Sequence, residues 1–329
     1  MSERSIQSPE LTVLIPLFNE AESLPELYTQ LIAALEPMNR PFELLFIDDG
    51  SRDLSFDTIE KLRDRDERVR AVQFRRNYGK SAALAVGFQE ALAHSFVVTL
   101  DADLQDDPME IPGLIEDLEG GFDLVSGWKQ ARQDPITKTL PSKFFNWVTS
   151  KVAGFRLHDF NCGLKAYRRE VVETIPVYGE LHRYLPVLAH WSGFRVTERP
   201  VSHHARKYGD SKFGLGRFTH GFFDLLTVYF VSKYTRRPLH WFGSLGMLSF
   251  GLGLCFAAYL SWLWLNGIGI GTRPLLLFSV LLMLLGIQLI SMGLIGEMIT
   301  HVSRKDEDYA VRRRLGEQPK RRAGDQESS

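Results

Sequence analysis

The sequence has 329 residues, of which 44% are hydrophobic, and its formal net charge is −1 at pH 7. This length allows one large domain or two smaller ones and leaves room for a sizeable core. Because basic residues do not dominate the chain, the charge argues against nucleic acid as a partner.

From the N-terminus onward, apolar runs that predict strands alternate with stretches that predict helices. An apolar run at residues 11–17 predicts a strand, and leucines at helical spacing predict a helix over residues 21–35. The alternation continues with predicted strands at 42–47, 69–74, 97–100 and 122–126 and predicted helices at 54–65, 81–93 and 138–152. Such alternation is typical of an α/β domain built on a mostly parallel sheet.

Polar side chains follow the predicted strands where each strand ends. They are Asn19, Asp48, Asp49, Asn77 and Asp101. Ligands of parallel sheets bind beyond the carboxyl ends of the strands, so we expect these side chains to line one cleft. No Gly-x-Gly-x-x-Gly motif follows the first strand, which argues against a Rossmann dehydrogenase.

The apolar run that begins at residue 97 ends in a series of acidic residues. Successive strand residues point to opposite faces, so Asp101 and Asp103 are expected to share a face, which Gln105 joins if the chain stays extended. Such oxygen ligands suit Mg²⁺ or Mn²⁺. The alternative is an acidic turn that caps a helix beginning near Pro108, and the pattern alone does not decide between the two.

Two apolar spans near the C-terminus predict a membrane protein. Residues 241–265 and 275–295 contain no charged side chain, and each has about the ~20 residues that a bilayer requires. Basic residues precede the first span and follow the second, whereas the loop between the spans carries only Arg273. By the positive-inside rule we expect a multi-pass protein of the inner or plasma membrane with its α/β domain and both termini in the cytoplasm.

These features predict four regions. They are a cytoplasmic α/β domain at 1–210, a juxtamembrane segment at 211–240, a two-helix anchor at 241–297 and a basic tail at 298–329, which its polar composition predicts to be disordered. Within residues 212–233, polar and apolar side chains separate onto two helical faces, which favours an amphipathic helix in the membrane interface over a helix packed on the soluble core.

In the first span, small residues recur at intervals of four at Ser249, Gly253 and Ala257. This row allows close contact with the second span or with a neighbouring subunit, and the latter would make a homo-oligomer.

Together these motifs resemble family 2 of the inverting glycosyltransferases, which have the GT-A fold, and specifically its polyprenyl-phosphate branch. The motifs that carry the resemblance are IPLFNE at 15–20, DDGS at 48–51, RNYGK at 76–80, DADLQD at 101–106, DFNCGLK at 159–165 and HHARKYGDSK at 203–212. The paired C-terminal spans look like the membrane anchor of bacterial members. The region at 180–186 lacks the Gln-x-x-Arg-Trp motif of processive synthases, which favours a single sugar transfer.

The resemblance implies a nucleotide-sugar donor, a polyprenyl-phosphate acceptor and a divalent cation, Mg²⁺ or Mn²⁺. The implied donor-binding residues are Pro16, Asn19, Glu20, Asp48, Asp49, Ser51, Asn77, Lys80, Asp101 and Arg206. The implied metal ligands are Asp101, Asp103 and Gln105. Lys129, Lys138 and Ser142 match positions that hold the acceptor phosphate, with Lys129 in place of a more usual Arg.

Asp159 matches the residue usually assigned as the catalytic base, and Asp103 would also be catalytic through the metal. A phosphate monoester is already largely ionised at neutral pH, since its second pKa is ~6, so we expect Asp159 to orient groups as much as to remove a proton.

By resemblance to bacterial members, the expected enzyme is a metal-dependent hexosyltransferase that uses UDP-glucose. One alternative is a family 2 transferase that glycosylates the hydroxyl of another membrane lipid. Another is a non-catalytic membrane scaffold that only binds a nucleotide sugar, against which the intact acidic motifs argue.

Overall fold

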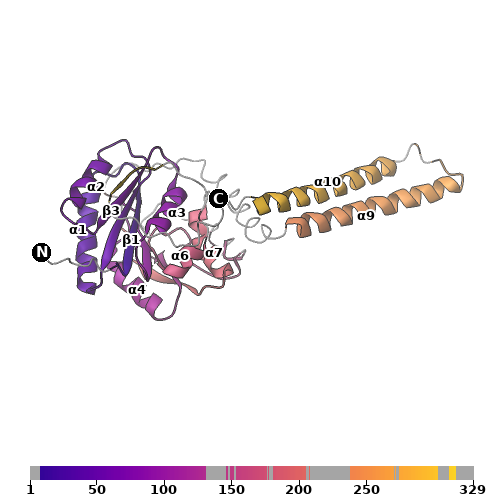
Figure 1. Ribbon diagram of the computed structural model, residues 1–329. Helices are drawn as coiled ribbons and strands as arrows, with labels where there is room; N and C mark the ends of the chain where they lie inside the picture. Colours follow the sequence, from indigo (N-terminus) through magenta and orange to yellow (C-terminus); the bar gives the residue numbers. More distant parts are fainter. Residues whose placement is uncertain are drawn as a thin grey trace. The chain divides into compact units, whose positions relative to one another are not determined.

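The computed structural model describes residues 8–130, 146, 149–151, 153–175, 177, 181–204, 207, 238–269, 271, 274–302 and 311–315 (Figure 1). The chain divides into two compact units, Met1–Asp224 with Asp308–Ser329, and Leu225–Glu307. The predicted interfacial helix at 212–233 and most of the predicted helix at 138–152 lie outside the described residues, although Asn146 and residues 149–151 are helical.

In the first unit, strands and helices alternate through the first five strands. The strands are β1 (Leu11–Leu17), β2 (Phe42–Asp48), β3 (Val69–Phe74), β4 (Phe96–Thr99), β5 (Leu124–Lys129), β6 (Lys165–Arg168), β7 (Val196–Val201) and β8 (Val311–Leu315). The helices are α1 (Leu24–Leu35), α2 (Ser55–Arg63), α3 (Lys80–Glu90), α4 (Ile111–Glu119), α6 (Arg169–Thr174) and α7 (Leu185–Trp191), with short 3-10 turns η1 (Glu36–Met38), η2 (Pro108–Glu110) and η3 (Leu181–Tyr184).

The described strands form one mixed sheet in the order β7-β5-β6-β4-β1-β2-β3-β8. Strands β4, β1, β2 and β3 are parallel neighbours, β5 and β7 are also parallel, and β6 runs antiparallel between β5 and β4. The predicted α/β domain with a mostly parallel sheet is therefore confirmed. Its parallel centre brings the carboxyl ends of β1, β2, β3 and β4 to one edge.

Helices cover both faces of the sheet, as Figure 1 shows. On one face, alternate β1 residues such as Val13 and Ile15 pack against the leucines of α1 and against α2 and α4. On the other face, Leu14 and residues of β2 and β3 pack against α3, α6 and α7. Strands buried on both faces read as continuous apolar runs, which is why β1 and β3 have the bounds that the sequence predicts.

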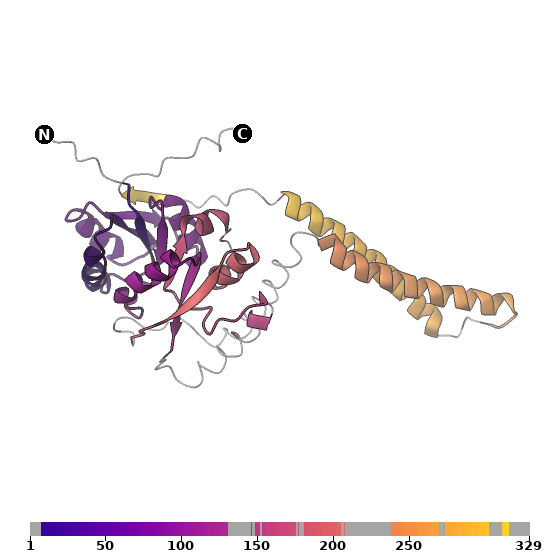
Figure 2. The ribbon, with the colours of Figure 1, turned by 90° about the horizontal axis from the view of Figure 1, so that it is seen from below.

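Part of the basic tail forms a strand, which the sequence analysis did not predict. Val311–Leu315 makes β8 and pairs antiparallel with β3, at whose edge it lies in yellow in Figure 2. The prediction of a disordered tail is wrong for these five residues. An edge strand presents unpaired backbone N–H and C=O groups, and β8 supplies partners for those of β3.

The second unit contains a hairpin of two long helices, α9 (Pro238–Leu265) and α10 (Pro274–Val302), which run side by side (Figures 1 and 2). Both are long and apolar enough to cross a membrane, with mean hydropathy values of 1.6 and 2.5 over the candidate spans. Two residues of the predicted small-residue row face α10. Ser249 donates its hydroxyl to the Leu282 carbonyl at 2.9 Å, and a Cβ on Gly253 would lie 2.7 Å from the Ser279 carbonyl oxygen.

Candidate active site

The acid motif does not continue β4 as an extended strand. Strand β4 ends at Thr99, the chain turns through residues 102–104, and Leu104 adopts a left-handed conformation with φ of +60°. Asp101 and Asp103 therefore do not lie on one extended strand, and the condition for Gln105 to join them, that the chain stays extended, is not met. The turn instead lets the backbone N–H of Gln105 donate to Asp103 Oδ1 at 3.3 Å, and the motif stays at the carboxyl edge of the sheet.

Asp101 lies between a lysine and a second carboxylate. Its Oδ1 forms an ion pair with Lys80 Nζ, at the start of α3, and both side chains are about one-third exposed. A Cβ built on Gly163 would lie 2.5 Å from Asp101 Oδ2 and 2.9 Å from Asp106 Oδ2, so these two oxygens converge on the glycine. Any larger residue at position 163 would displace both carboxylates.

Asp106 is buried, with only 1% of its side chain exposed, and it faces two cationic or potentially cationic groups. Lys129 Nζ lies 2.7 Å and His203 Nδ1 lies 3.7 Å from Asp106 Oδ1. Burial alone would raise the pKa of Asp106, but His203 and Lys129 outweigh it and hold the pKa well below its usual range. Burial likewise opposes the charge of Lys129, whose pKa Asp106 nevertheless holds above its ordinary value. Both members of the pair are ionised at neutral pH.

The two carboxylates of the DDGS motif hold backbone segments at the same edge. Asp48 accepts from the Ser51 amide at 2.8 Å and from Gln73 Nε2 at 2.9 Å. Asp49 accepts from the amides of Tyr78 and Gly79 at 2.7 and 2.9 Å. Asp49 thereby ties the end of β2 to the RNYGK motif that leads into Lys80.

Gly50 is the residue that lets these segments approach each other. It has a φ of +72°, and a Cβ there would lie 2.5 Å from the carbonyl carbon of Arg76. Only glycine satisfies both the left-handed backbone and the close contact.

The IPLFNE motif at the end of β1 is joined to the DDGS motif. Ser51 accepts from the Asn19 amide at 2.8 Å, Asn19 Oδ1 accepts from the Arg52 amide at 2.8 Å, and the Glu20 amide donates to Ser55 at 2.9 Å. Pro16 lies in β1 and Asn77 is exposed in the loop after β3. The strand-end residues that were predicted to line one cleft therefore lie at one edge of the sheet.

Asp159 is buried, with 1% of its surface exposed. Its Oδ1 accepts from the Asn161 amide at 3.0 Å, and its carbonyl oxygen lies 3.4 Å from the Ser126 hydroxyl, which donates to it. These contacts fix the loop that carries Gly163 close to the carboxylates of Asp101 and Asp106. Arg206, Lys138 and Ser142 lie outside the described residues. Lys207, next to Arg206, pairs with Glu26 of α1 at 2.7 Å.

Sequence reasoning missed two groups at this edge. The first is Asp106, which lies inside a recognised motif, but nothing in the sequence signals its burial. The second is His182 of η3, whose Nδ1 lies 2.8 Å from the hydroxyl of Ser81, the neighbour of Lys80. Burial, and then the charge of Lys80, lower the pKa of His182 well below its ordinary value, so this imidazole is neutral.

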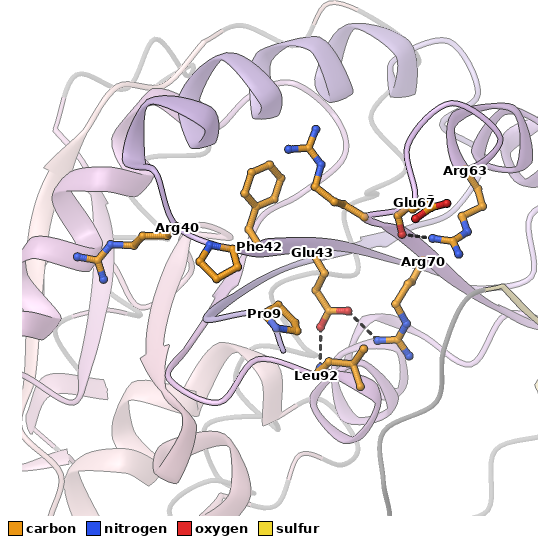
Figure 3. Close-up of a pocket in the computed structure, with 10 residues that line it drawn as sticks. Pro9, Arg40, Phe42, Glu43, Arg63, Glu67, Arg70 and Leu92 are labelled. Carbon is orange, nitrogen blue, oxygen red and sulfur yellow. Dashed lines mark hydrogen bonds and ion pairs between the residues drawn. The ribbon is translucent and has the colours of Figure 1, made fainter. Parts of the chain in front are cut away.

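A cavity of about 330 Å³ lies at the opposite, amino-terminal end of the parallel strands (Figure 3). Its wall includes a buried ion pair in which Arg70 donates to Glu43 at 2.8 Å, while Glu43 also accepts from the Leu92 amide at 2.6 Å. Glu43 and Arg70 are paired with each other, and none of the sequence motifs reaches this cavity, so it does not bring together the residues expected to bind the donor.

The residues of the acid motif fit a divalent cation that is shared with a substrate. Among the described residues, no three His, Cys, Asp or Glu side chains are grouped to hold a metal ion by themselves. Mg²⁺ is commonly held by one or two carboxylates together with substrate phosphates. Two carboxylates and one amide within five residues, Asp101, Asp103 and Gln105, provide hard oxygen donors of that kind.

Comparisons with known proteins agree with this arrangement. Residues 12–176 match the family described as glycosyl transferase family 2, and residues 237–302 match the one described as the GtrB C-terminal hairpin. The chain is 36% identical to dodecaprenyl-phosphate galacturonate synthase of Rhizobium johnstonii over 95% of both chains. It is 38% identical to undecaprenyl-phosphate 4-deoxy-4-formamido-L-arabinose transferase of Pseudomonas syringae, over 88% of this chain and 85% of the relative.

Solved structures share the fold. Glucosyl-3-phosphoglycerate synthase of Mycobacterium tuberculosis, in complex with Mn²⁺, UDP-glucose and phosphoglyceric acid, matches 67% of this chain and 79% of its own with a TM-score of 0.52 and 18% identity. The same enzyme with Mg²⁺ and UDP gives a TM-score of 0.51 at 18% identity. The first unit therefore has the GT-A fold, and the chain belongs to glycosyltransferase family 2, within its polyprenyl-phosphate glycosyltransferases.

Proposed function

We propose that this protein catalyses a single, inverting transfer of a sugar from a nucleotide sugar to a polyprenyl phosphate at the cytoplasmic face of a membrane. The observation that carries the proposal is that the DDGS, RNYGK and DADLQD motifs meet at one edge of the sheet, in a chain that also contains an apolar helical hairpin. Resemblance to bacterial members of the family favours UDP-glucose as the donor. The relatives named for galacturonate and formamido-arabinose add two further donors to be tested.

The hairpin α9–α10 would anchor the enzyme where both substrates meet. A polyprenyl phosphate keeps its phosphate at the level of the lipid headgroups, and nucleotide sugars are made in the cytoplasm. An anchor with both chain termini in the cytoplasm would hold the carboxyl edge of the sheet within reach of both.

Departure of the nucleoside diphosphate requires positive charge at the diphosphate. A divalent cation held by Asp101, Asp103 and Gln105 would supply part of it when bound. Lys80, already beside Asp101, and Arg206 would add cationic donors to the phosphate oxygens. Pro16, Asn19, Glu20, Asp48, Asp49, Ser51 and Asn77 are proposed to shape the adjoining nucleotide site.

The acceptor phosphate arrives already ionised, so the reaction needs little general-base catalysis. A phosphate oxygen forms a bond to the anomeric carbon while the bond to the diphosphate oxygen breaks on the opposite side. Lys129, Lys138 and Ser142 are proposed to hold the acceptor phosphate. Asp159, buried and bonded to the Asn161 amide, would act by orienting the loop at 159–165.

Two matched carboxylate-to-amide variants test these roles. Asp103→Asn is expected to lower kcat by at least ~100-fold, because it weakens binding of the divalent cation whose charge would stabilise the leaving diphosphate. Asp159→Asn is expected to keep turnover within ~10-fold with a polyprenyl-phosphate acceptor. A loss in Asp159→Asn as large as in Asp103→Asn would make Asp159 an essential base and contradict its orienting role.

The overall function is tested with the purified full-length protein and undecaprenyl phosphate. Radiolabelled UDP-glucose, UDP-galacturonate, UDP-linked formamido-arabinose and GDP-sugars are offered in turn with Mn²⁺ or Mg²⁺. The expected product is an acid-labile lipid-phosphate sugar formed from one of them. Label transferred to a lipid hydroxyl, such as that of diacylglycerol, and not to the lipid phosphate would contradict the proposed acceptor.

A further inference from the structure

The first turn of α3 carries Lys80 without a side-chain cap at its start. Gly79 occupies the N-cap position with a φ of +94°, and glycine has no side chain that could accept the first amides of the helix. Asp49 holds the amides of Tyr78 and Gly79, which fixes the chain before the turn but not the turn itself. The place of the Lys80 ammonium beside Asp101 therefore depends on what other parts of the chain hold this turn.

Ser81, in the same turn, directs its hydroxyl to η3. Its Oγ lies 2.8 Å from His182 Nδ1, and the backbone N–H of His182 donates to the same oxygen at 3.3 Å. Only 4% of Ser81 is exposed, so water has little access to these hydrogen bonds. The contact joins the residue next to Lys80 to a segment 101 positions further along the chain.

These two contacts indicate which tautomer His182 adopts. The Ser81 oxygen accepts the backbone N–H, and donation of the single hydroxyl proton to Nδ1 gives that proton a partner. Burial, and then the charge of Lys80, lower the pKa of His182 well below its ordinary value, so the ring carries one proton. That proton then lies on Nε2, and His182 accepts from Ser81 through Nδ1.

The backbone at His182 has firm support from the core. Turn η3 leads directly into α7, and Tyr184 and Leu185 at the junction are 0% and 2% exposed. Leu185 belongs to the apolar cluster that also contains Ala82 and Ala83 of α3. His182 is therefore held on a segment that packs in the same core as α3, and it can serve as an anchor for Ser81.

We propose that His182 is a positioning residue for Lys80: by accepting from the Ser81 hydroxyl it fixes the first turn of α3 and keeps the Lys80 ammonium where the donor diphosphate would bind. The inference rests on the proposed function for the ligand of Lys80, because the Ser81–His182 contact itself is independent of any substrate. One hydrogen bond contributes little to the stability of a whole domain. Its loss acts locally, since a misplacement of about 1 Å at an active site can cost about 100-fold in rate.

A different role would have His182 touch the substrate through Nε2. Two amide variants separate the roles, because they reproduce different nitrogens of the ring. Asn places its amide group near the position of Nδ1 and can accept from the Ser81 hydroxyl, whereas Gln places its amide group near the position of Nε2. Restoration by Asn therefore indicates an anchor for Ser81, and restoration by Gln indicates direct contact with the substrate.

The first measurement is the Kd of the full-length protein for UDP in the presence of Mn²⁺. His182→Ala and Ser81→Ala are each expected to raise this Kd about tenfold, and the double variant to raise it by no more, because both changes remove the same contact. His182→Asn is expected to stay within threefold of the wild type, and His182→Gln to bind as weakly as His182→Ala. The control His94→Ala, at an exposed position before β4, should leave the Kd unchanged.

Losses that multiply in the double variant, or an Asn variant that binds no better than His182→Ala, would overturn the proposal. Restoration by Gln and not by Asn would overturn it as well. The KM for undecaprenyl phosphate is expected to stay within threefold in all of these variants. A tenfold rise of that KM in His182→Ala and not in Ser81→Ala would mean that His182 binds the acceptor and does not act through Lys80.

The link to Lys80 is tested in a Lys80→Met background. With no ammonium left to position, His182→Ala is expected to change the Kd for UDP by less than twofold in that background. A further tenfold loss would show that His182 acts on UDP by another route and would contradict the proposal.

Two further outcomes are decisive. If the Ala variants do not fold, the Asn and Gln variants, which keep a polar side chain at the site, decide between the two roles by the same comparison. If the wild type binds UDP but transfers no sugar to a polyprenyl phosphate, the proposed function fails, while the cycle on UDP binding still tests the role of His182.

Discussion

Among the carboxylates at the sheet edge, Asp49 shows how one side chain can set both geometry and charge. Only 4% of it is exposed, and its two oxygens accept the amides of Tyr78 and Gly79. Burial raises the pKa of Asp49 to about 6, against the opposing effect of those two hydrogen bonds. The residue that holds the RNYGK segment therefore changes its charge close to neutral pH.

This raised pKa predicts how stability depends on pH. The folded-state pKa of about 6 lies above the ordinary aspartate pKa of 3.8, so the folded protein binds the proton more tightly than the unfolded chain. The contribution of Asp49 to the free energy of unfolding is therefore full below about pH 4 and is lost as the pH rises through about 6, a fall of about 3 kcal/mol.

Asp49→Asn removes this titration. The unfolding free energy of the wild type minus that of Asp49→Asn is expected to fall by about 3 kcal/mol between pH 4 and pH 7. Denaturant titration of the two purified proteins measures this difference. The same exchange at the exposed Asp57 on α2 serves as the control for loss of a surface carboxylate. A flat difference for Asp49→Asn would contradict the raised pKa.

At the scale of elements, the hairpin α9–α10 depends on glycines that bring the two backbones together. A Cβ built on Gly286 would lie 2.6 Å from the Gly246 carbonyl oxygen and 2.7 Å from the Phe250 amide nitrogen, whereas a Cβ on Gly251 meets nothing within 4 Å. Backbone atoms cannot move aside as a side chain can, so substitution at Gly286 must separate the helices.

Gly286→Ala is accordingly expected to destabilise the hairpin, because the added methyl group meets backbone atoms of α9. Both exchanges favour the helix by about 1 kcal/mol in propensity, so Gly251→Ala, which meets no neighbour, is expected to be neutral or slightly stabilising. The measurement is the midpoint of unfolding of the two variants in mixed detergent micelles, followed by tryptophan fluorescence. Equal midpoints for the two variants would show that the close contact does not hold the helices together.

Elements that the sequence predicts are those whose own residues specify them. Strands β1 and β3 are buried apolar runs bounded by polar residues, and their predicted bounds are correct. Strand β6 has four residues, two of them basic, and β7 includes Pro200, so neither carries a strand pattern. These two strands form because β5 lies between them and pairs with both.

The same distinction applies to the candidate site. The strand-end rule predicted which motifs meet at the sheet edge, because connectivity alone determines it. The turn at Leu104 could not be predicted, since leucine rarely adopts a left-handed conformation. Nor could the burial of Asp106, which arises only when Lys129 of β5 and His203 pack against it.

For the whole molecule, the two units require different surroundings. The first unit buries its apolar side chains in cores on both faces of the sheet. The hairpin instead exposes large apolar side chains along its length, including Trp264 at 63%, Leu277 at 66% and Met298 at 69%. An exposed apolar surface of this extent is stable in a bilayer and not in water, which supports the proposed membrane anchor.

The proposed topology can be tested by labelling single introduced cysteines, because the two native cysteines can be kept from reacting. Cys162 is 1% exposed, and burial raises the pKa of its thiol to about 12, so it is unreactive in the folded protein. Cys255 lies exposed on α9 and is first replaced by Ala. In that background, a single cysteine is placed either at Asn266, in the turn after α9, or at Leu54, which is 67% exposed before α2.

With both termini in the cytoplasm, the loop between the spans faces the other side of the membrane. Asn266→Cys is therefore expected to react with a membrane-impermeant maleimide in intact cells, or in intact spheroplasts if an outer membrane surrounds them. Leu54→Cys is expected to react only after the membrane is permeabilised. Labelling in the reverse order would place the GT-A unit outside the cytoplasm, away from its nucleotide sugars. Labelling of both variants in intact cells would mean that α9 and α10 do not separate the turn from the GT-A unit.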